Sequence, residues 1–268
     1  MIENLTNIGK TPCFQAKILN KIPALKHGFL TSQGGVSTYE FASLNCALPE
    51  MSLDNPDYIN QNMNIVAKSF AISRSRLFGV KQVHEADVYH AVSGAMNSVP
   101  IADAIVTTQK GLALGIRTAD CVPIILSSEN GDIIGSIHAG WPSTYKGIVQ
   151  NTVKKMVELG AELNQIRAAV GPAIAGSSYE VERELMLKFK TQNLEYSAYF
   201  LPAKRAKHYM FNLSGLVAKI LYNSGIRHIE HLQIDTYEND NLFFSHRRAT
   251  HKNHAKNGRQ LSVIMIRD

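Results

Sequence analysis

Two apolar runs rich in β-branched residues, Val122–Leu126 and Ile133–Ile137, dominate the middle of the chain. The short segment between them contains an Asn-Gly pair, which is typical of a tight turn, so the pattern predicts a buried β-hairpin. In an antiparallel pair the start of one strand lies opposite the end of the other. We therefore expect Cys121, which precedes the first strand, and His138, which follows the second run, to lie side by side.

Helical and strand patterns alternate along the rest of the chain. Apolar residues at helical spacing predict helices, and continuous or alternating apolar runs predict strands. The expected helices are Asn55–Ile72, a helix that Ser143 caps and Gly160 ends, Val181–Lys190 and Leu213–Asn223. The further expected strands are Gly79–His90, Ala102–Thr108, Arg167–Gly171, Ile229–Ile234 and Leu261–Ile266. Because the order is not strictly βαβ, we expect an α+β layered sandwich, with mixed sheets flanked by helices. No Pro-, Gly- or Ser-rich linker divides the chain, so residues 1–268 are expected to form a single domain.

Composition and charge narrow the function classes. No apolar stretch approaches the ~20 residues of a membrane helix, so no membrane partner is expected. Three cysteines and an N-terminus without a secretory pattern favour a reducing, cytoplasmic location. The formal net charge of +6 suits anionic ligands, but the charges are dispersed and not interleaved with aromatic residues, so nucleic acid is not expected as a partner. The glycine-rich dinucleotide and P-loop motifs are also absent.

His84, Cys121 and His138 are the candidate reactive residues. A catalytic zinc ion takes three protein ligands and keeps a fourth position for water or substrate, and these residues supply two imidazoles and one thiolate. All three are expected at strand ends. The residues alone leave three interpretations open: a metal site, a nucleophile–base pair of Cys121 and His138, and ordinary side chains without a chemical role.

A set of motifs resembles the YfiH family over about His27 to Ile266. In chain order these are HGFLTSQGGVS with ASLN, KQVHEADV, TADCVPIIL, SIHAGW, GPAIAGSSYEV and FFSHRR. Members of that family carry the older name of laccase-domain or polyphenol oxidase proteins and are now described as purine nucleoside phosphorylases with adenosine deaminase activity. The resemblance implies that His84, Cys121 and His138 bind one zinc ion and are catalytic.

The resemblance also implies the substrates. The expected nucleosides are adenosine and inosine, with guanosine and methylthioadenosine as further candidates. Phosphate is expected as the second substrate. The chain is expected to be a monomer or a homodimer. Zinc would lower the pKa of a bound water toward ~7. Copper would also bind in vitro, because Cu²⁺ outcompetes Zn²⁺ at most sites of this kind. The alternative functions are a copper-dependent polyphenol oxidase and a hydrolase with Cys121 as nucleophile.

Three further residues are candidates for positions around the substrate. Ser43 and Asn45 lie in the ASLN motif and are expected to contact the ribose or the base. Asp120 adjoins Cys121 and is a candidate both for substrate binding and for orienting a histidine ligand, since metal-bound imidazoles usually need a carboxylate or carbonyl partner.

Two arginines that are usual in the family are absent. Ser32 and Pro142 stand at these positions, so phosphate must be bound by other cations. Arg247, Arg248 and Arg259 are the expected replacements. The alternative is Lys146, beside Ser143.

Overall fold

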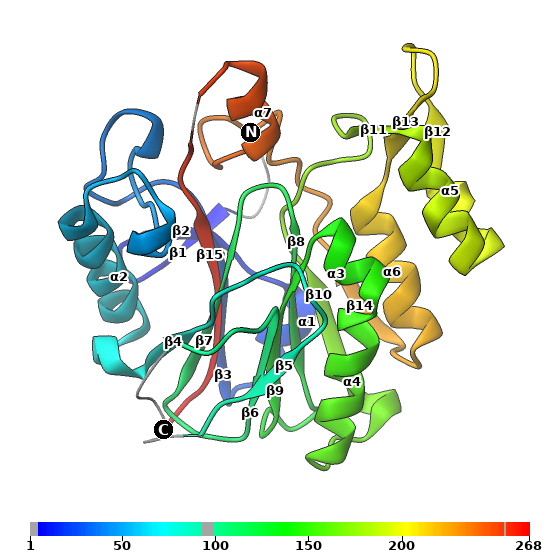
Figure 1. Ribbon diagram of the computed structural model, residues 1–268. Coiled ribbons are helices and arrows are strands. Elements are labelled where there is room, and N and C mark those ends of the chain that lie inside the picture. Colours follow the sequence, from blue (N-terminus) through cyan, green and yellow to red (C-terminus); the bar gives the residue numbers. More distant parts are fainter. Residues whose placement is uncertain (1–4, 93–98, 255) are drawn as a thin grey trace.

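Two six-stranded sheets packed face to face form the centre of the protein, and helices cover their outer faces (Figure 1). The computed structural model describes residues 5–92, 99–254 and 256–268. Helix α2 lies on one side of the pair of sheets, and α4 and α6 lie on the other. The helices are α1 (Lys17–Asn20), α2 (Pro56–Phe70), α3 (Trp141–Lys146), α4 (Ile148–Glu158), α5 (Arg183–Gln192), α6 (Leu213–Asn223) and α7 (His246–His251).

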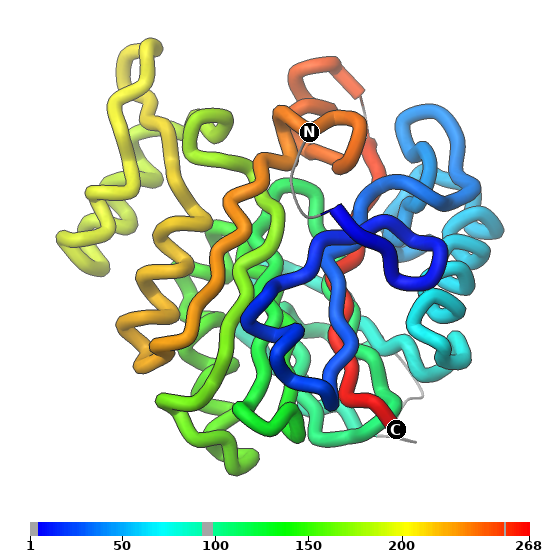
Figure 2. Tube along the Cα trace, turned by 180° about the vertical axis from the view of Figure 1, so that it is seen from behind, coloured from blue at the N-terminus to red at the C-terminus, as the bar shows by residue number. Residues whose placement is uncertain are grey.

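The first sheet has the strand order β1-β2-β3-β15-β7-β4. Neighbouring strands are antiparallel except for β4 and β7, which are parallel. From behind, Figure 2 shows the last strand of the chain, β15, beside the early strand β3. The strands are β1 (Leu5–Ile8), β2 (Thr11–Phe14), β3 (Leu25–Leu30), β4 (Leu77–Gly79), β7 (Ala113–Thr118) and β15 (Gln260–Ile266).

The second sheet has the order β14-β10-β8-β9-β6-β5 and contains the predicted hairpin. Strands β8 and β9 pair antiparallel with Val122 opposite Ala139, which confirms that prediction. The strands are β5 (Val88–His90), β6 (Ala104–Thr107), β8 (Val122–Ser127), β9 (Ile134–Ala139), β10 (Arg167–Val170) and β14 (His228–His231). A smaller antiparallel sheet contains β11 (Glu180–Glu182), β12 (Phe200–Pro202) and β13 (His208–Phe211).

The alternation of side chains along each strand builds the layers. In β8, Ile124 and Leu126 pack in the core that α4 and α6 cover, whereas Ile125 packs between the sheets. In β15, Ile264 points between the sheets and Val263 points toward α2. Strands that are apolar on both faces therefore hold a four-layer arrangement together, and the expected fold class of mixed sheets flanked by helices is confirmed.

Two helix predictions illustrate how local capping decides boundaries. The predicted helix Asn55–Ile72 is α2, and the Asn55 side chain accepts the Asp57 backbone N–H at 2.9 Å. The helix predicted from Ser143 to Gly160 is in fact two helices, because Gly147 adopts a left-handed φ of 93° and separates α3 from α4. Ser143 lies inside α3 rather than at its cap.

The predicted strand Gly79–His90 is wrong. Strand β4 ends at Gly79 and β5 begins only at Val88. His84 lies in the connecting loop with a left-handed φ of 61°, so it is not at a strand end. Within the residues that the structure describes, no helix is long and apolar enough to cross a membrane.

Candidate metal centre

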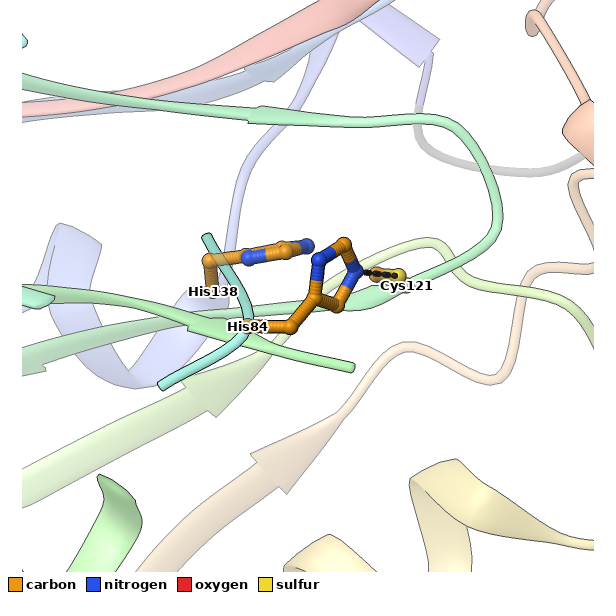
Figure 3. Close-up of side chains that lie close together, drawn as sticks. All are labelled: His84, Cys121 and His138. Atoms are coloured by element: carbon orange, nitrogen blue, oxygen red, sulfur yellow. Dashed lines mark hydrogen bonds between the residues drawn. The ribbon is translucent and has the colours of Figure 1, made fainter. Parts of the chain in front are cut away.

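His84, Cys121 and His138, here called the ligand cluster, converge from three separate segments (Figure 3). His84 comes from the loop before β5, Cys121 directly precedes β8, and His138 lies in β9. One ligand atom from each residue lies within 4.8 Å of the other two, and Cys121 Sγ is 3.7 Å from His84 Nε2. The hairpin brings Cys121 and His138 together, because Pro123, two residues after Cys121, pairs with His138.

The buried carboxylate of Asp103 positions both histidines. His138 Nδ1 donates to Asp103 Oδ1 at 2.7 Å, which leaves Nε2 of His138 for a ligand. The backbone N–H groups of Val83, His84 and Glu85 also donate to this carboxylate, at 3.1, 3.0 and 2.7 Å. One side chain thus orients the His138 ring and shapes the loop that carries His84.

Asp120, the residue expected to orient a histidine, has different partners. It adopts a left-handed φ of 86° and accepts hydrogen bonds from Thr236 Oγ1, Ser245 Oγ and the Arg247 backbone N–H. These bonds tie the start of α7 to the segment that carries Cys121. The orienting role belongs to Asp103 instead, which the sequence pattern presented only as a carboxylate at the start of the predicted strand Ala102–Thr108.

The electrostatics of the cluster favour a thiolate beside an imidazolium. Burial by itself raises the pKa of Cys121, but the charge and hydrogen bond of His138 and the hydrogen bond of His84 lower it to about 6. Burial lowers the pKa of His138, whereas Cys121 and Asp103 raise it to about 9. A metal ion that displaces the His138 proton would be bound by one thiolate and two imidazoles, the donor set that zinc and copper prefer.

The distance between two of these donors fits a shared metal ion. With Zn–N near 2.0 Å and Zn–S near 2.3 Å, neighbouring ligand atoms of a tetrahedral site lie roughly 3.3–3.7 Å apart. The 3.7 Å between Cys121 Sγ and His84 Nε2 agrees with this range. His84 is exposed, Cys121 half-buried and His138 buried, so the cluster is open on the side of His84.

Two cavities meet at the ligand cluster. The first has a volume of about 370 Å³ and the second about 390 Å³. Both are lined by His84, Ala119, Cys121 and His246. The first cavity is lined by basic and polar residues, Gln82, Arg117, Thr118, Lys256, Asn257 and Arg259, and also by apolar ones, Ala47, Leu48, Met51 and Val80. The second has aromatic and apolar walls from Trp141, Pro142, Ile174, Tyr179 and Leu213.

Comparison with known proteins identifies the family. Residues 26–267 match the family described as multi-copper polyphenol oxidoreductase laccase. The chain belongs to this laccase family. A purine nucleoside phosphorylase of Rickettsia prowazekii is 38% identical over 188 residues, which are 70% of this chain and 77% of the relative. A purine nucleoside phosphorylase of Deinococcus radiodurans is 34% identical over 241 residues, 90% of this chain and 89% of the relative.

Solved structures agree with this laccase family fold. The hypothetical protein YfiH of Bacillus licheniformis superposes with a TM-score of 0.87 at 27% identity and covers 97% of both chains. YlmD of Geobacillus stearothermophilus superposes with a TM-score of 0.87 at 26% identity, over 99% of both chains. The resemblance to the YfiH family is thereby confirmed.

The structure places Ser43 and Asn45 outside the lining of both cavities. Asn45 is completely buried, its amide donates to Asp54, and its oxygen accepts the backbone N–H groups of Ala47 and Arg259. The Ser43 hydroxyl donates to a backbone carbonyl. Asn45 thus holds the backbone of Ala47 and Arg259, which line the first cavity, whereas Ser43 contacts Ser32 and Gly35 in its own loop.

The four cations expected to bind phosphate have separate locations. Arg248 donates to the backbone carbonyls of Thr236 and Tyr237 and lines neither cavity. Arg247 lines the second cavity, but it donates to the Glu180 carbonyl and its guanidinium lies 5.0 Å from the centre of the Tyr179 ring. Lys146 pairs with Glu85, and Arg259 lines the first cavity.

Sequence reasoning missed three polar residues of the first cavity, Arg117, Thr118 and Asn257. Thr118 opens the TADC motif, and Asn257 precedes Gly258-Arg259, so both adjoin residues that had been singled out. Arg117 also lines this cavity, and its Nε donates to the Cys46 carbonyl at 2.6 Å.

Proposed function

We propose that this protein is a zinc-dependent purine nucleoside phosphorylase that also deaminates adenosine. The observation that carries the proposal is the position of the ligand cluster where a basic cavity and an aromatic cavity meet. Relatives named purine nucleoside phosphorylase support the choice of reaction. The cluster of His84, Cys121 and His138 would hold the zinc ion.

Phosphorolysis needs two substrates on opposite sides of one carbon atom. A phosphate oxygen forms a bond to C1′ of the ribose while the C1′–N9 bond breaks, and the purine takes the electron pair and a proton. The products are ribose 1-phosphate and the free base. A bound zinc ion would act as a Lewis acid and lower the pKa of bound water. The Trp141 and Tyr179 side chains give the second cavity an apolar wall suited to a purine.

Deamination would use the same centre. Water adds at C6 of adenosine and ammonia leaves, so that adenosine and water give inosine and ammonia. Asp103 would keep the His138 ring in place throughout, because its carboxylate also fixes the loop of His84.

A cysteine hydrolase is the second candidate. Asp103, His138 and Cys121 form a carboxylate–imidazole–thiol series, and the lowered pKa of Cys121 suits a nucleophile. A chelator distinguishes the two functions: it abolishes a zinc-dependent activity, whereas a thiol nucleophile stays active. Zinc that also protects Cys121 from a thiol alkylating agent would support the phosphorylase.

Copper-dependent phenol oxidation is favoured only by the family description. Multicopper centres need many clustered histidines. Among the described residues, the one group of suitable ligands contains two histidines, His84 and His138, and one cysteine. We expect protein purified without added metal to carry about one zinc ion per chain; copper with an intense visible absorption band would contradict this.

Product analysis tests the proposed reaction directly. Inosine, adenosine and methylthioadenosine are incubated with and without phosphate, and the products are separated by chromatography. We expect free bases only when phosphate is present, and inosine from adenosine in either case. Release of the base at the same rate without phosphate would identify a nucleoside hydrolase and contradict the proposal.

A further inference from the structure

Two buried hydrogen-bond donors in the wall of the first cavity have no partner. Thr118 is 2% exposed and Asn257 is 8% exposed, and in the described part of the chain neither Thr118 Oγ1 nor Asn257 Nδ2 has a hydrogen-bond partner. Both residues line the first cavity. An unsatisfied buried donor costs roughly 1–3 kcal/mol, so a pair of them on residues that line one cavity indicates a ligand with acceptor atoms.

The orientation of the Asn257 amide is fixed by its neighbour. Arg259 Nη1 donates to Asn257 Oδ1 at 2.9 Å, so the oxygen is the acceptor and the NH₂ group is the free end. The same guanidinium nitrogen donates to the Asn257 and Gly258 carbonyls, and the Arg259 backbone N–H donates to Asn45. The free amide is therefore held rigidly.

The charge of the first cavity selects an anion. Arg117, Lys256 and Arg259 line it, and none of the described residues that line it is acidic. Burial lowers the pKa of Arg117 to about 10. This value is still well above neutral pH, so the guanidinium stays protonated. Neutral donors and guanidinium groups together are the usual ligands of a phosphate oxyanion.

We propose that the first cavity binds inorganic phosphate through the Thr118 hydroxyl and the Asn257 amide, beside the positive charge of Arg259. This inference rests on the proposed function and deepens it, because it assigns phosphate to one cavity and leaves the second cavity to the nucleoside. His84 and Cys121 line both cavities, so phosphate bound here lies next to the ligand cluster.

Two isosteric substitutions test the site. Thr118→Val removes a hydroxyl that has no protein partner, so the melting temperature should not fall. Asn257→Asp keeps an acceptor for Arg259 Nη1 and places negative charge where the free amide lies. Asn60→Asp is the control, since Asn60 is exposed on α2 and lines neither cavity.

Calorimetric titration of the zinc-loaded protein with sodium phosphate, at ionic strength held constant with chloride, measures binding without turnover. We expect the phosphate Kd to rise at least tenfold in Asn257→Asp, about fivefold in Thr118→Val and less than twofold in the control. The KM for inosine should change less than threefold in all three variants. Unchanged phosphate Kd values in both test variants would overturn the assignment.

Two further results separate this inference from the proposed function. Phosphate binding that the variants weaken, in a protein that shows no phosphorolysis, supports the phosphate site and refutes the phosphorylase. Phosphorolysis with an unchanged phosphate KM in both variants supports the phosphorylase and refutes the phosphate site. Adenosine monophosphate is titrated in parallel: if only its binding weakens, the site recognises the phosphoryl group of a nucleotide and the assignment to inorganic phosphate is wrong.

Discussion

The two cavities beside the ligand cluster have volumes of about 370 and about 390 Å³, yet their walls differ. The first presents Thr118 and Asn257 as donors without partners, next to arginine side chains. The second presents the rings of Trp141 and Tyr179. A cavity with free donors suits a small anion and a cavity with aromatic walls suits a base, so one centre can serve a reaction of two unlike substrates.

Arg247 and Arg248 differ from Thr118 and Asn257, because their donor groups already have partners in the protein. Arg248 donates to backbone carbonyls, and Arg247 donates to Glu180 and stacks on Tyr179. Both therefore act mainly in holding α7 against the rest of the protein. An anion site is indicated by donors that remain unpaired, not by the number of positive charges in a segment.

Removal of His84, a ligand residue that lines both cavities, should have the largest effect on zinc binding and on activity. In His84→Ala we expect the zinc content to fall from about one to below about 0.1 per chain, and phosphorolysis to fall at least ~10³-fold. Metal analysis and a coupled assay measure these. His254→Ala is the control, since His254 is exposed and lines neither cavity. A fully active His84→Ala variant would contradict the assignment of the cluster.

Asp103→Asn should loosen both histidine ligands, His84 and His138, and so lower the metal affinity. The amide keeps one acceptor oxygen but replaces the other by a donor, so it cannot accept from the His138 N–H and all three backbone N–H groups at once, and we expect metal affinity to drop ~10–100-fold. Competition with a zinc chelator measures the affinity. Asp57→Asn, which removes an exposed carboxylate from α2, should change it less than twofold. Equal affinities in the two variants would argue against positioning by Asp103.

Removal of the metal should expose one reactive thiol. The pKa of Cys121 is lowered to about 6, so its alkylation rate in chelator-treated protein should rise through pH 6 and level off above pH 7. At pH 7 its thiolate fraction is then ~30 times that of an ordinary thiol of pKa near 8.5. Burial raises the pKa values of Cys13 and Cys46 to about 12, and these thiols should not react.

Mass spectrometry of the alkylated peptides follows each cysteine separately. Added zinc should protect Cys121. A midpoint near pH 8.5 for Cys121, with no protection by zinc, would contradict the electrostatic account of the cluster.

Trp141→Ala should affect only the second cavity. Contact of a base with an aromatic side chain is worth ~1–3 kcal/mol, so we expect the KM for inosine to rise about tenfold. The KM for phosphate should stay within twofold, the reverse of the pattern expected for Thr118→Val. Steady-state kinetics with each substrate varied in turn measures both. Equal increases in the two KM values would mean that the cavities are not specialised.

Part of this site was predictable from local pattern. The hairpin of Val122–Leu126 and Ile133–Ile137 placed Cys121 near His138 because strand pairing follows from apolar runs and a turn. His84 was selected with them, but the strand assigned to it was wrong. Its loop is shaped by hydrogen bonds to Asp103, 19 residues away in sequence, and periodicity contains no information about such contacts.

The substrate residues were harder to predict for a related reason. Sequence shows that Asn45 and Arg248 are polar, but not that buried partners already occupy their hydrogen-bonding groups. Thr118 and Asn257 show the converse, because the absence of a partner appears only in the folded chain. The single-domain organisation and the choice between monomer and homodimer stay predictions.

The most direct test of the division between the cavities is the electron density of the zinc-loaded protein crystallised with phosphate and an inosine analogue whose base cannot leave. The account predicts an anomalous zinc peak between His84, Cys121 and His138, phosphate at Thr118 and Asn257, and the base against Trp141. Both ligands in one cavity, or a zinc peak away from these three residues, would contradict it.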